Sequence, residues 1–137
     1  MITLTQYVGI HKDSADWSRP RQAAAIVLCD KVNKLMTVAM TGGIVFPVNP
    51  KTNCQISGEI YGGFRPQDCP IGAPGSSHKI GKGVDIFDIG GKFAAWCVVN
   101  KAQLATLGLY MENPKVTPGW VHLQTREVPS GNIIFNP

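Results

Sequence analysis

Charged and aromatic residues are both scarce in this chain of 137 residues, at 16% and 8%. The low charge, together with a hydrophobic fraction of 44%, excludes an intrinsically disordered protein, because disordered chains carry more charge and fewer apolar residues. No apolar stretch approaches the roughly 18 residues that a membrane-spanning helix needs, so stable membrane insertion is not expected. The chain is therefore expected to fold as one domain over residues 1–137.

Cysteine motifs and a secretory signal are also missing. The four cysteines contain no C-x-x-C pair, which argues against a cysteine zinc site and a dithiol redox site, and reduced, chemically idle thiols are expected. The amino terminus has no basic start followed by an apolar run and a small-residue cleavage site, so synthesis in a cytoplasm without a signal peptide is expected.

Basic residues exceed acidic ones but form no cluster. The net charge is +4, and the lysines are dispersed along the chain without interleaved aromatic residues. This pattern does not favour a nucleic-acid partner, although it suits a mild attraction to a polyanion such as the bacterial cell wall.

One helix is well marked in the sequence, at about residues 20–41. Ser18 and Pro20 indicate its start, and the pair Gly42–Gly43 its end. Its apolar stripe is predicted to contain Ile26, Cys29, Val32 or Asn33, and Met36.

The remaining segments do not alternate regularly between strands and helices. Residues 54–64 and 119–128 alternate as strands do, 83–89 read as a strand or strand end, and 91–109 read as one or two helical pieces. Residues 65–83 are rich in Pro, Gly and Ser and are too long for an idle connection, which favours a functional loop. This order predicts the α+β class.

Two of the three histidines lie in a pattern that suits a metal site. His78 and Asp85 flank Gly81 and Gly83, which would let the backbone turn tightly enough for both side chains to face one point, and His122 lies on a predicted strand. Two imidazoles and one carboxylate leave the fourth position of a tetrahedral zinc site open, as in catalytic sites. On the residues alone, a hydrogen-bonded core histidine explains His122 at least as well.

Three segments resemble a known family of enzymes. In order and spacing, "GGFRP", "SSHKIGKGVDIFD" and "GLYMENPKVTPGWVHLQTR" are similar to the zinc peptidases that cleave peptidoglycan stem peptides. That family includes D-Ala-D-Ala carboxypeptidases and L-alanyl-D-glutamate endopeptidases, and it shares its fold with the Hedgehog signalling domain. Its patterns S-x-H-x-x-G-x-[AG]-x-D and W-[VI]-H are matched by Ser76, His78, Gly81, Gly83, Asp85, Trp120, Val121 and His122.

The resemblance covers about residues 56–127 and implies a fold and site residues. The implied fold is a small, mainly antiparallel sheet with flanking helices. His78, Asp85 and His122 would bind Zn²⁺, and Arg65 would anchor a carboxylate of the substrate, unless it forms only a surface ion pair.

The general base of the family is not where the pattern places it. Many relatives carry Glu or Asp three residues before the last histidine ligand, and this chain has Gly119 there. Glu112, expected in the loop that leads into the strand of His122, is the leading replacement, with Glu59 and Glu127 as weaker alternatives. Asp88 is expected either to cap the following helix or to bond a ligand histidine.

The resemblance implies a monomeric, phage endolysin-like zinc peptidase that acts on the stem peptide in the cell wall. The sequence leaves open whether it is a carboxypeptidase or an endopeptidase, because it does not show whether the substrate groove is open at both ends. The alternative is a zinc-stabilised module that binds peptidoglycan or belongs to a phage particle, since the missing carboxylate at Gly119 is compatible with lost catalysis.

Overall fold

Helix α2, Arg19–Thr41, is the longest element in the computed structural model, which describes residues 1–137. Ser18 is its N-cap, Pro20 lies in its first turn and Gly42 ends it, so the predicted helix is confirmed. The prediction for its apolar stripe is wrong at Ile26, which is 56% exposed. The buried face consists of Ala25, Leu28, Cys29, Val32, Leu35, Met36 and Ala39.

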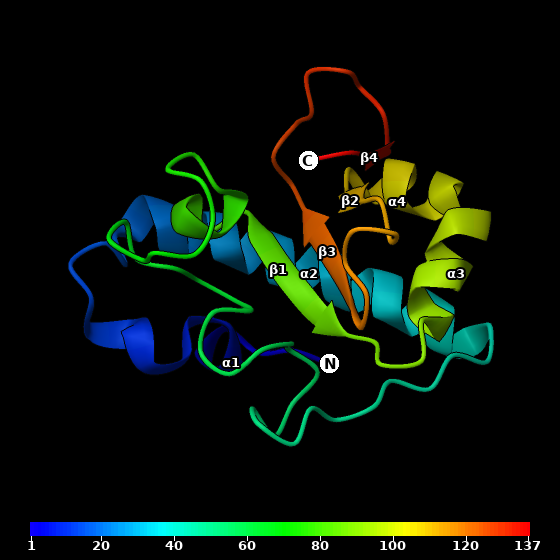
Figure 1. Cartoon of the computed structure of the whole chain (residues 1–137), viewed down its shortest axis with the longest axis horizontal. Helices are drawn as coiled ribbons and strands as arrows, with labels where there is room; N and C mark the ends of the chain where they lie inside the picture. The colour runs from blue at the N-terminus through cyan, green and yellow to red at the C-terminus, as the bar shows by residue number, and fades with distance from the viewer.

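A mixed four-stranded sheet lies against this helix (Figure 1). Its strands are β1 (Gly83–Phe87), β2 (Tyr110–Glu112), β3 (Trp120–Gln124) and β4 (Ile134–Phe135), in the order β1-β3-β2-β4. The pairs β1–β3 and β2–β3 are antiparallel, and the pair β2–β4 is parallel. The predicted α+β class is therefore confirmed, with strands near the expected residues 83–89 and 119–128.

Shorter helices surround the sheet. They are α1 (Leu4–Val8), α3 (Lys92–Val99), α4 (Lys101–Leu107) and the 3-10 turns η1 (Gly9–Asp13) and η2 (Ser77–Ile80). The two helical pieces predicted at 91–109 correspond to α3 and α4. Asp88 accepts hydrogen bonds from the amides of Phe93 and Ala94 in the first turn of α3, so the capping role expected for Asp88 is confirmed.

The strand expected at 54–64 does not form. Only Cys54 and Ile56 make isolated bridges, to Asn49 and Ile86. Gly58 has a φ of +74°, which turns the chain away from an extended course. Gly62 then packs so closely on the segment before it that an added Cβ would lie 2.0 Å from the carbonyl oxygen of Ser57. The segment folds back on itself, which an alternating pattern does not reveal.

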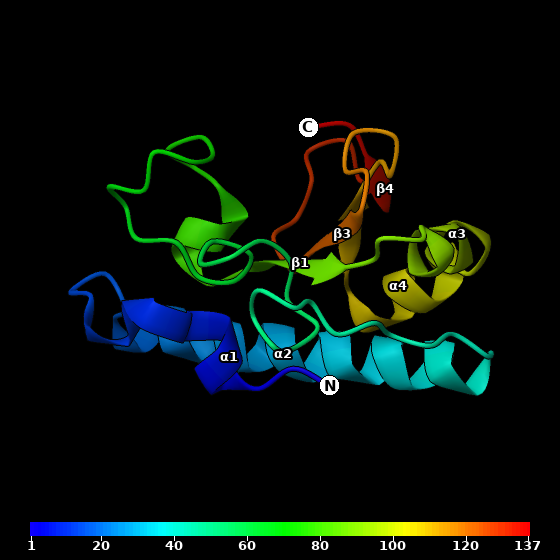
Figure 2. The ribbon, with the colours of Figure 1, turned by 60° about the horizontal axis from the view of Figure 1, so that its bottom comes forward.

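The hydrophobic core lies between α2 and the sheet. In Figure 2, α1 and α2 form a layer beneath β1 and β3, while the loop before η2 and the carboxyl-terminal segment rise on the other side. Twenty-three buried apolar residues form one cluster that runs from Ile2 to Leu123. No helix has the length and apolar character needed to span a bilayer.

The four cysteines, Cys29, Cys54, Cys69 and Cys97, are buried and form no disulfide, as predicted. Burial raises the pKa of the Cys29 thiol to about 11, and so keeps it in the unreactive protonated form.

Candidate metal centre

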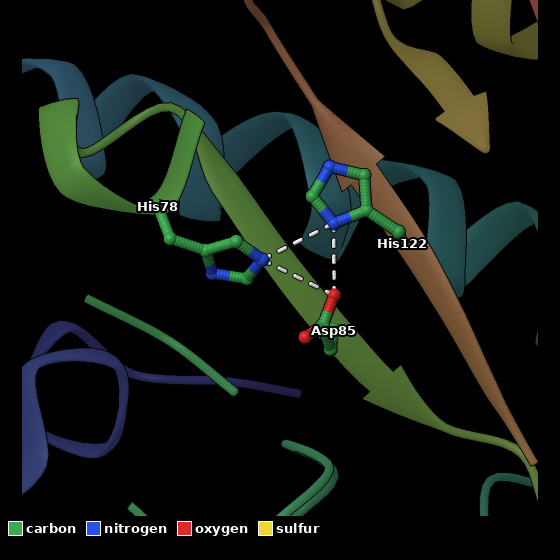
Figure 3. A group of neighbouring side chains, drawn as sticks. All are labelled: His78, Asp85 and His122. Atoms are coloured by element: carbon green, nitrogen blue, oxygen red, sulfur yellow. Dashed lines mark hydrogen bonds and ion pairs between the residues drawn. The ribbon is translucent and has the colours of Figure 1, made fainter. Parts of the chain in front are cut away.

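His78, Asp85 and His122 come together on the face of the sheet that points away from α2 (Figure 3). His78 lies in η2, Asp85 in the middle of β1 and His122 in the middle of β3. Asp85 and His122 are direct partners across the antiparallel pair, so their side chains project from the same face. All three residues are buried, with exposed fractions of 2%, 8% and 5%.

The donor atoms of the three side chains are within hydrogen-bonding distance of one another. His122 Nδ1 is 2.8 Å from Asp85 Oδ1, and His78 Nε2 is 3.3 Å from the same oxygen. The two ring nitrogens, His78 Nε2 and His122 Nδ1, are 3.2 Å apart. Two nitrogens and one carboxylate oxygen therefore face a common point.

Neighbouring acceptors determine which nitrogen of each ring carries a proton. The Gly63 carbonyl oxygen lies 2.7 Å from His78 Nδ1, and because a carbonyl only accepts, that nitrogen donates. Gln124 Oε1 lies 3.1 Å from His122 Nε2, while the Gln124 amide nitrogen donates to the Arg126 carbonyl, so His122 Nε2 donates to Oε1. In the neutral rings, both nitrogens that face Asp85 then carry lone pairs.

A bound cation would relieve the repulsion among these three acceptor atoms. Three acceptor atoms that converge in a buried space repel one another unless a proton or a metal ion lies between them. The trio can therefore hold a metal ion, and each imidazole already has the outer hydrogen bond that fixes its ring in known metal sites.

Electrostatics within the trio favour an ionised Asp85. Burial alone would raise the pKa of Asp85, but in the metal-free protein the charge of a protonated His78 and the hydrogen bonds from protonated rings hold it well below its ordinary value. Burial lowers the pKa of His78 despite the opposing effect of Asp85. For His122, burial is outweighed by the hydrogen bond to Asp85 and the charges of Asp85 and Glu112, which raise its pKa.

The two glycines expected to shape this turn have different roles. Gly81 ends η2 in the left-handed region, with a φ of +75°, as the tight-turn prediction requires. Gly83 instead provides space, since a Cβ there would lie 2.2 Å from Ser77 Oγ and 3.1 Å from His122 Cε1. Gly83, the first residue of β1, thus allows η2 to pack directly against the start of that strand.

Arg65 contacts the trio directly. Its Nη2 is 3.0 Å from Asp85 Oδ2, and its Nε donates to the Tyr61 carbonyl oxygen at 2.6 Å. The side chain is 12% exposed, so this is a mostly buried ion pair and not the surface pair considered as the alternative. Arg65 holds one oxygen of Asp85 and leaves Oδ1 facing the histidines; its predicted contact with a substrate carboxylate stays a prediction.

Glu112 lies in the wall of the cavity that contains the trio. This cavity has a volume of about 610 Å³ and is also lined by Arg65, Trp120, Gln124 and Arg126. The register that pairs Tyr110 with Gln124 and Met111 with Leu123 brings Glu112, one residue further, opposite His122. Glu112 belongs to strand β2 and not to the loop expected from the sequence.

The other acidic candidates lie elsewhere. Glu59 is paired at 2.6 Å with Lys51, and both side chains are mostly exposed. Glu127 is exposed and does not line the cavity of the trio. Gly119 has a φ of +91° with no atom near its would-be Cβ, and it is likewise absent from the cavity wall. Among these positions, only Glu112 shares the cavity.

Sequence reasoning missed the groups that support the trio. Gln124 cannot serve as a base, because an amide does not usefully accept a proton, yet it bonds His122; its position two residues along the same strand places it on the same face. The role of the Gly63 carbonyl as a partner of His78 could not be predicted, because every residue has a backbone carbonyl whatever its type. Arg126 enters the cavity only because the chain after β3 turns back over it, bonding the Gly75 carbonyl.

Comparisons with known proteins return no similar chain: no family model matches, and neither does any curated protein or solved structure.

Proposed function

We propose that this protein is a zinc-dependent peptidase that hydrolyses a peptide bond in the stem peptide of bacterial peptidoglycan. One observation carries the proposal: the donor atoms of His78, Asp85 and His122 converge in the wall of a cavity that also contains Glu112. Three protein donors leave a zinc ion one of its four positions, which is typical of catalytic sites.

The donor set fits zinc in type and spacing. Imidazole nitrogens and a carboxylate oxygen are common zinc ligands, and two ligands of a tetrahedral zinc ion lie about 3.3 Å apart. The observed separations of 3.2 and 3.3 Å agree with this spacing, while the 2.8 Å between His122 and Asp85 is shorter. Arg65 on the outer oxygen of Asp85 and Gln124 on the outer nitrogen of His122 support the orientation.

Each residue of the site then has a part in hydrolysis. When bound, zinc activates water and polarises the scissile carbonyl. Glu112 takes a proton from the attacking water and passes it to the leaving amine. The amide C–N bond breaks, the hydroxyl of the water joins the acyl carbon, and a carboxylic acid and an amine are released. Gly63 and Gln124 keep both rings in the required tautomer, and Arg65 positions Asp85.

The biological setting follows from the resemblance. The protein is a monomeric, phage endolysin-like enzyme, made in a host cytoplasm and acting on the cell wall. Its dispersed net charge of +4 favours contact with the anionic wall.

Mass spectrometry of peptidoglycan fragments tests this function. Purified fragments are incubated with the zinc-loaded protein, with a chelator, and with the His122→Ala variant. New fragments that require both zinc and His122 are expected, and their masses identify the bond.

Intact fragments in all three reactions, from a protein shown to hold one zinc ion, would overturn the enzymatic proposal. That result would favour the zinc-stabilised binding module, and co-sedimentation with insoluble peptidoglycan would then test for binding.

A further inference from the structure

The cavity around the trio is joined to a second hollow. This hollow has a volume of about 430 Å³, and four residues line both spaces: Arg65, Ile71, Asp85 and Trp120. Because Asp85 belongs to both, the candidate metal centre lies where the two spaces meet. Both volumes are in the range of ordinary ligand sites, so each can hold part of a substrate.

The two hollows extend to opposite sides of β1. The first extends over β3 and β2, where Glu112, Gln124 and Arg126 line it. The second extends to the segment 57–62, which lies along the free edge of β1 because the Ser57 amide donates to the Asp85 carbonyl at 2.8 Å. β1 has β3 on one side and this segment on the other. A peptide lying across β1 would occupy both hollows.

Arg65 does not close the space at the metal centre. An enzyme that removes a terminal residue needs a cation that ends the groove by pairing with the terminal carboxylate. Arg65 lies at the junction, its Nε and Nη2 are engaged by Tyr61 and Asp85, and the groove continues beyond it. Its Nη1 remains to bind a carbonyl oxygen of a passing chain.

We infer that the site cuts internal peptide bonds and accommodates substrate residues on both sides of the scissile bond, one side in each hollow. This inference rests on the proposed peptidase function and specifies its substrate class: an endopeptidase substrate whose free carboxyl terminus is not required.

A matched pair of synthetic stem pentapeptides tests it, one ending in a free carboxylate and the other in a carboxamide. Both peptides are incubated with the zinc-loaded protein, and the products are identified by mass spectrometry. Cleavage of both at the same internal bond and at comparable rates is expected. Release of the last residue from the acid alone would overturn the inference while leaving the peptidase function intact. No cleavage of either peptide would overturn the function, and the inference with it.

A variant of the second hollow provides an independent measurement. Ile60 lines that hollow and is 42% exposed, so Ile60→Ala removes apolar contact area without emptying the core. Loss of part of its side-chain burial should raise KM about fivefold for the pentapeptide while kcat stays nearly constant. Val45→Ala is the control, since Val45 is 83% exposed and lines neither hollow. An unchanged KM in Ile60→Ala would contradict the use of the second hollow.

Discussion

Asp85 and His122 occupy directly opposed positions on β1 and β3, with Oδ1 and Nδ1 2.8 Å apart. Antiparallel pairing brings opposed side chains to the same face, so the register of two strands is enough to join residues that are 37 positions apart. When the proton of the neutral His122 ring is on Nε2 and is donated to Gln124, neither Asp85 Oδ1 nor His122 Nδ1 carries a proton. The pair is then suited to bind a cation.

Replacing His122 should remove the metal. The His122→Ala variant leaves only two donors, and the affinity for zinc should fall by at least about 100-fold, judging from the effect of losing even an outer-shell partner. His11→Ala is the matched control, because His11 contacts the Ile60 carbonyl and stacks on Tyr61 and is not one of the three donors. Metal content after dialysis is measured by elemental mass spectrometry. Equal zinc in both variants would refute the assignment of His122.

Glu112 should matter for catalysis and not for metal binding. Glu112→Gln keeps the shape of the side chain but cannot accept the proton, so kcat should fall about 100-fold to 10,000-fold while zinc stays bound. The control is Glu127→Gln, an exposed glutamate outside the cavity. Hydrolysis of a stem peptide and zinc content are measured on the same samples. Full activity in Glu112→Gln would remove this residue from the mechanism.

Gln124 should act through the tautomer of His122. Gln124→Leu removes the amide acceptor of the His122 Nε2 proton and leaves only the Ser77 hydroxyl, 3.2 Å away, so zinc affinity should fall by about 10-fold. Gln124→Glu restores an acceptor oxygen at the same place and should recover most of the affinity. Competition with a chromophoric chelator gives the zinc Kd for both variants. If Leu and Glu at this position behave alike, the hydrogen bond has no role in binding.

A methyl group at Gly83 should disturb the site. The new Cβ of Gly83→Ala would lie 2.2 Å from Ser77 Oγ, which forces η2 and the neighbouring His122 ring to shift. We expect a loss of about 1 to 3 kcal/mol in the free energy of unfolding, as for overpacked positions, together with weaker zinc binding. Gly90→Ala is the control, since its nearest contact would be Lys92 Cγ at 3.9 Å. Urea unfolding with and without zinc separates the two effects.

Stability should decline at alkaline pH. Burial raises the pKa of Cys29 from 9.0 to about 11 and the pKa of Tyr7 well above 10.0. Both groups are neutral in the folded state, so their contribution is complete below pH 9. Above that, the unfolded chain loses protons more readily than the folded one, and stability falls through pH 9 to 11 for Cys29 and from pH 10 upward for Tyr7.

The Tyr7→Phe variant isolates one part of this decline. It loses the hydrogen bond from the Tyr7 hydroxyl to the Gly83 carbonyl, worth about 1 kcal/mol at pH 8. At pH 11, one unit above the ordinary tyrosine pKa, the wild-type protein should have lost about 1.4 kcal/mol of the Tyr7 contribution, which removes the gap between the two proteins. Urea unfolding at both pH values measures it; a gap that widens at pH 11 would contradict the sign of this effect.

Local sequence signals predicted the elements that depend on local chemistry. Helix α2 begins at Ser18 and Pro20 and ends at Gly42, as predicted, because the start and the end of a helix depend only on neighbouring residues. The strand around Asp85 and that around His122 were likewise predicted, since alternation reflects the two faces of one strand. The segment 54–64 had the same alternation and failed as a strand, because the turn at Gly58 and the close packing of Gly62 are contacts made in the fold.

By itself, the sequence determined the α+β class and the long helix, because residue types and short spacings specify local backbone preferences. It offered His78, Asp85 and His122 as candidate ligands, but His122 only through the resemblance of its segment to a known family. Only the tertiary structure decided how those donors face one another. Strand register brings Glu112 opposite His122, Arg65 turns onto Asp85, and a second hollow continues past the site. Each of these depends on contacts between distant segments, and hydrophobic packing of the sheet on α2 fixes them only when the whole chain folds.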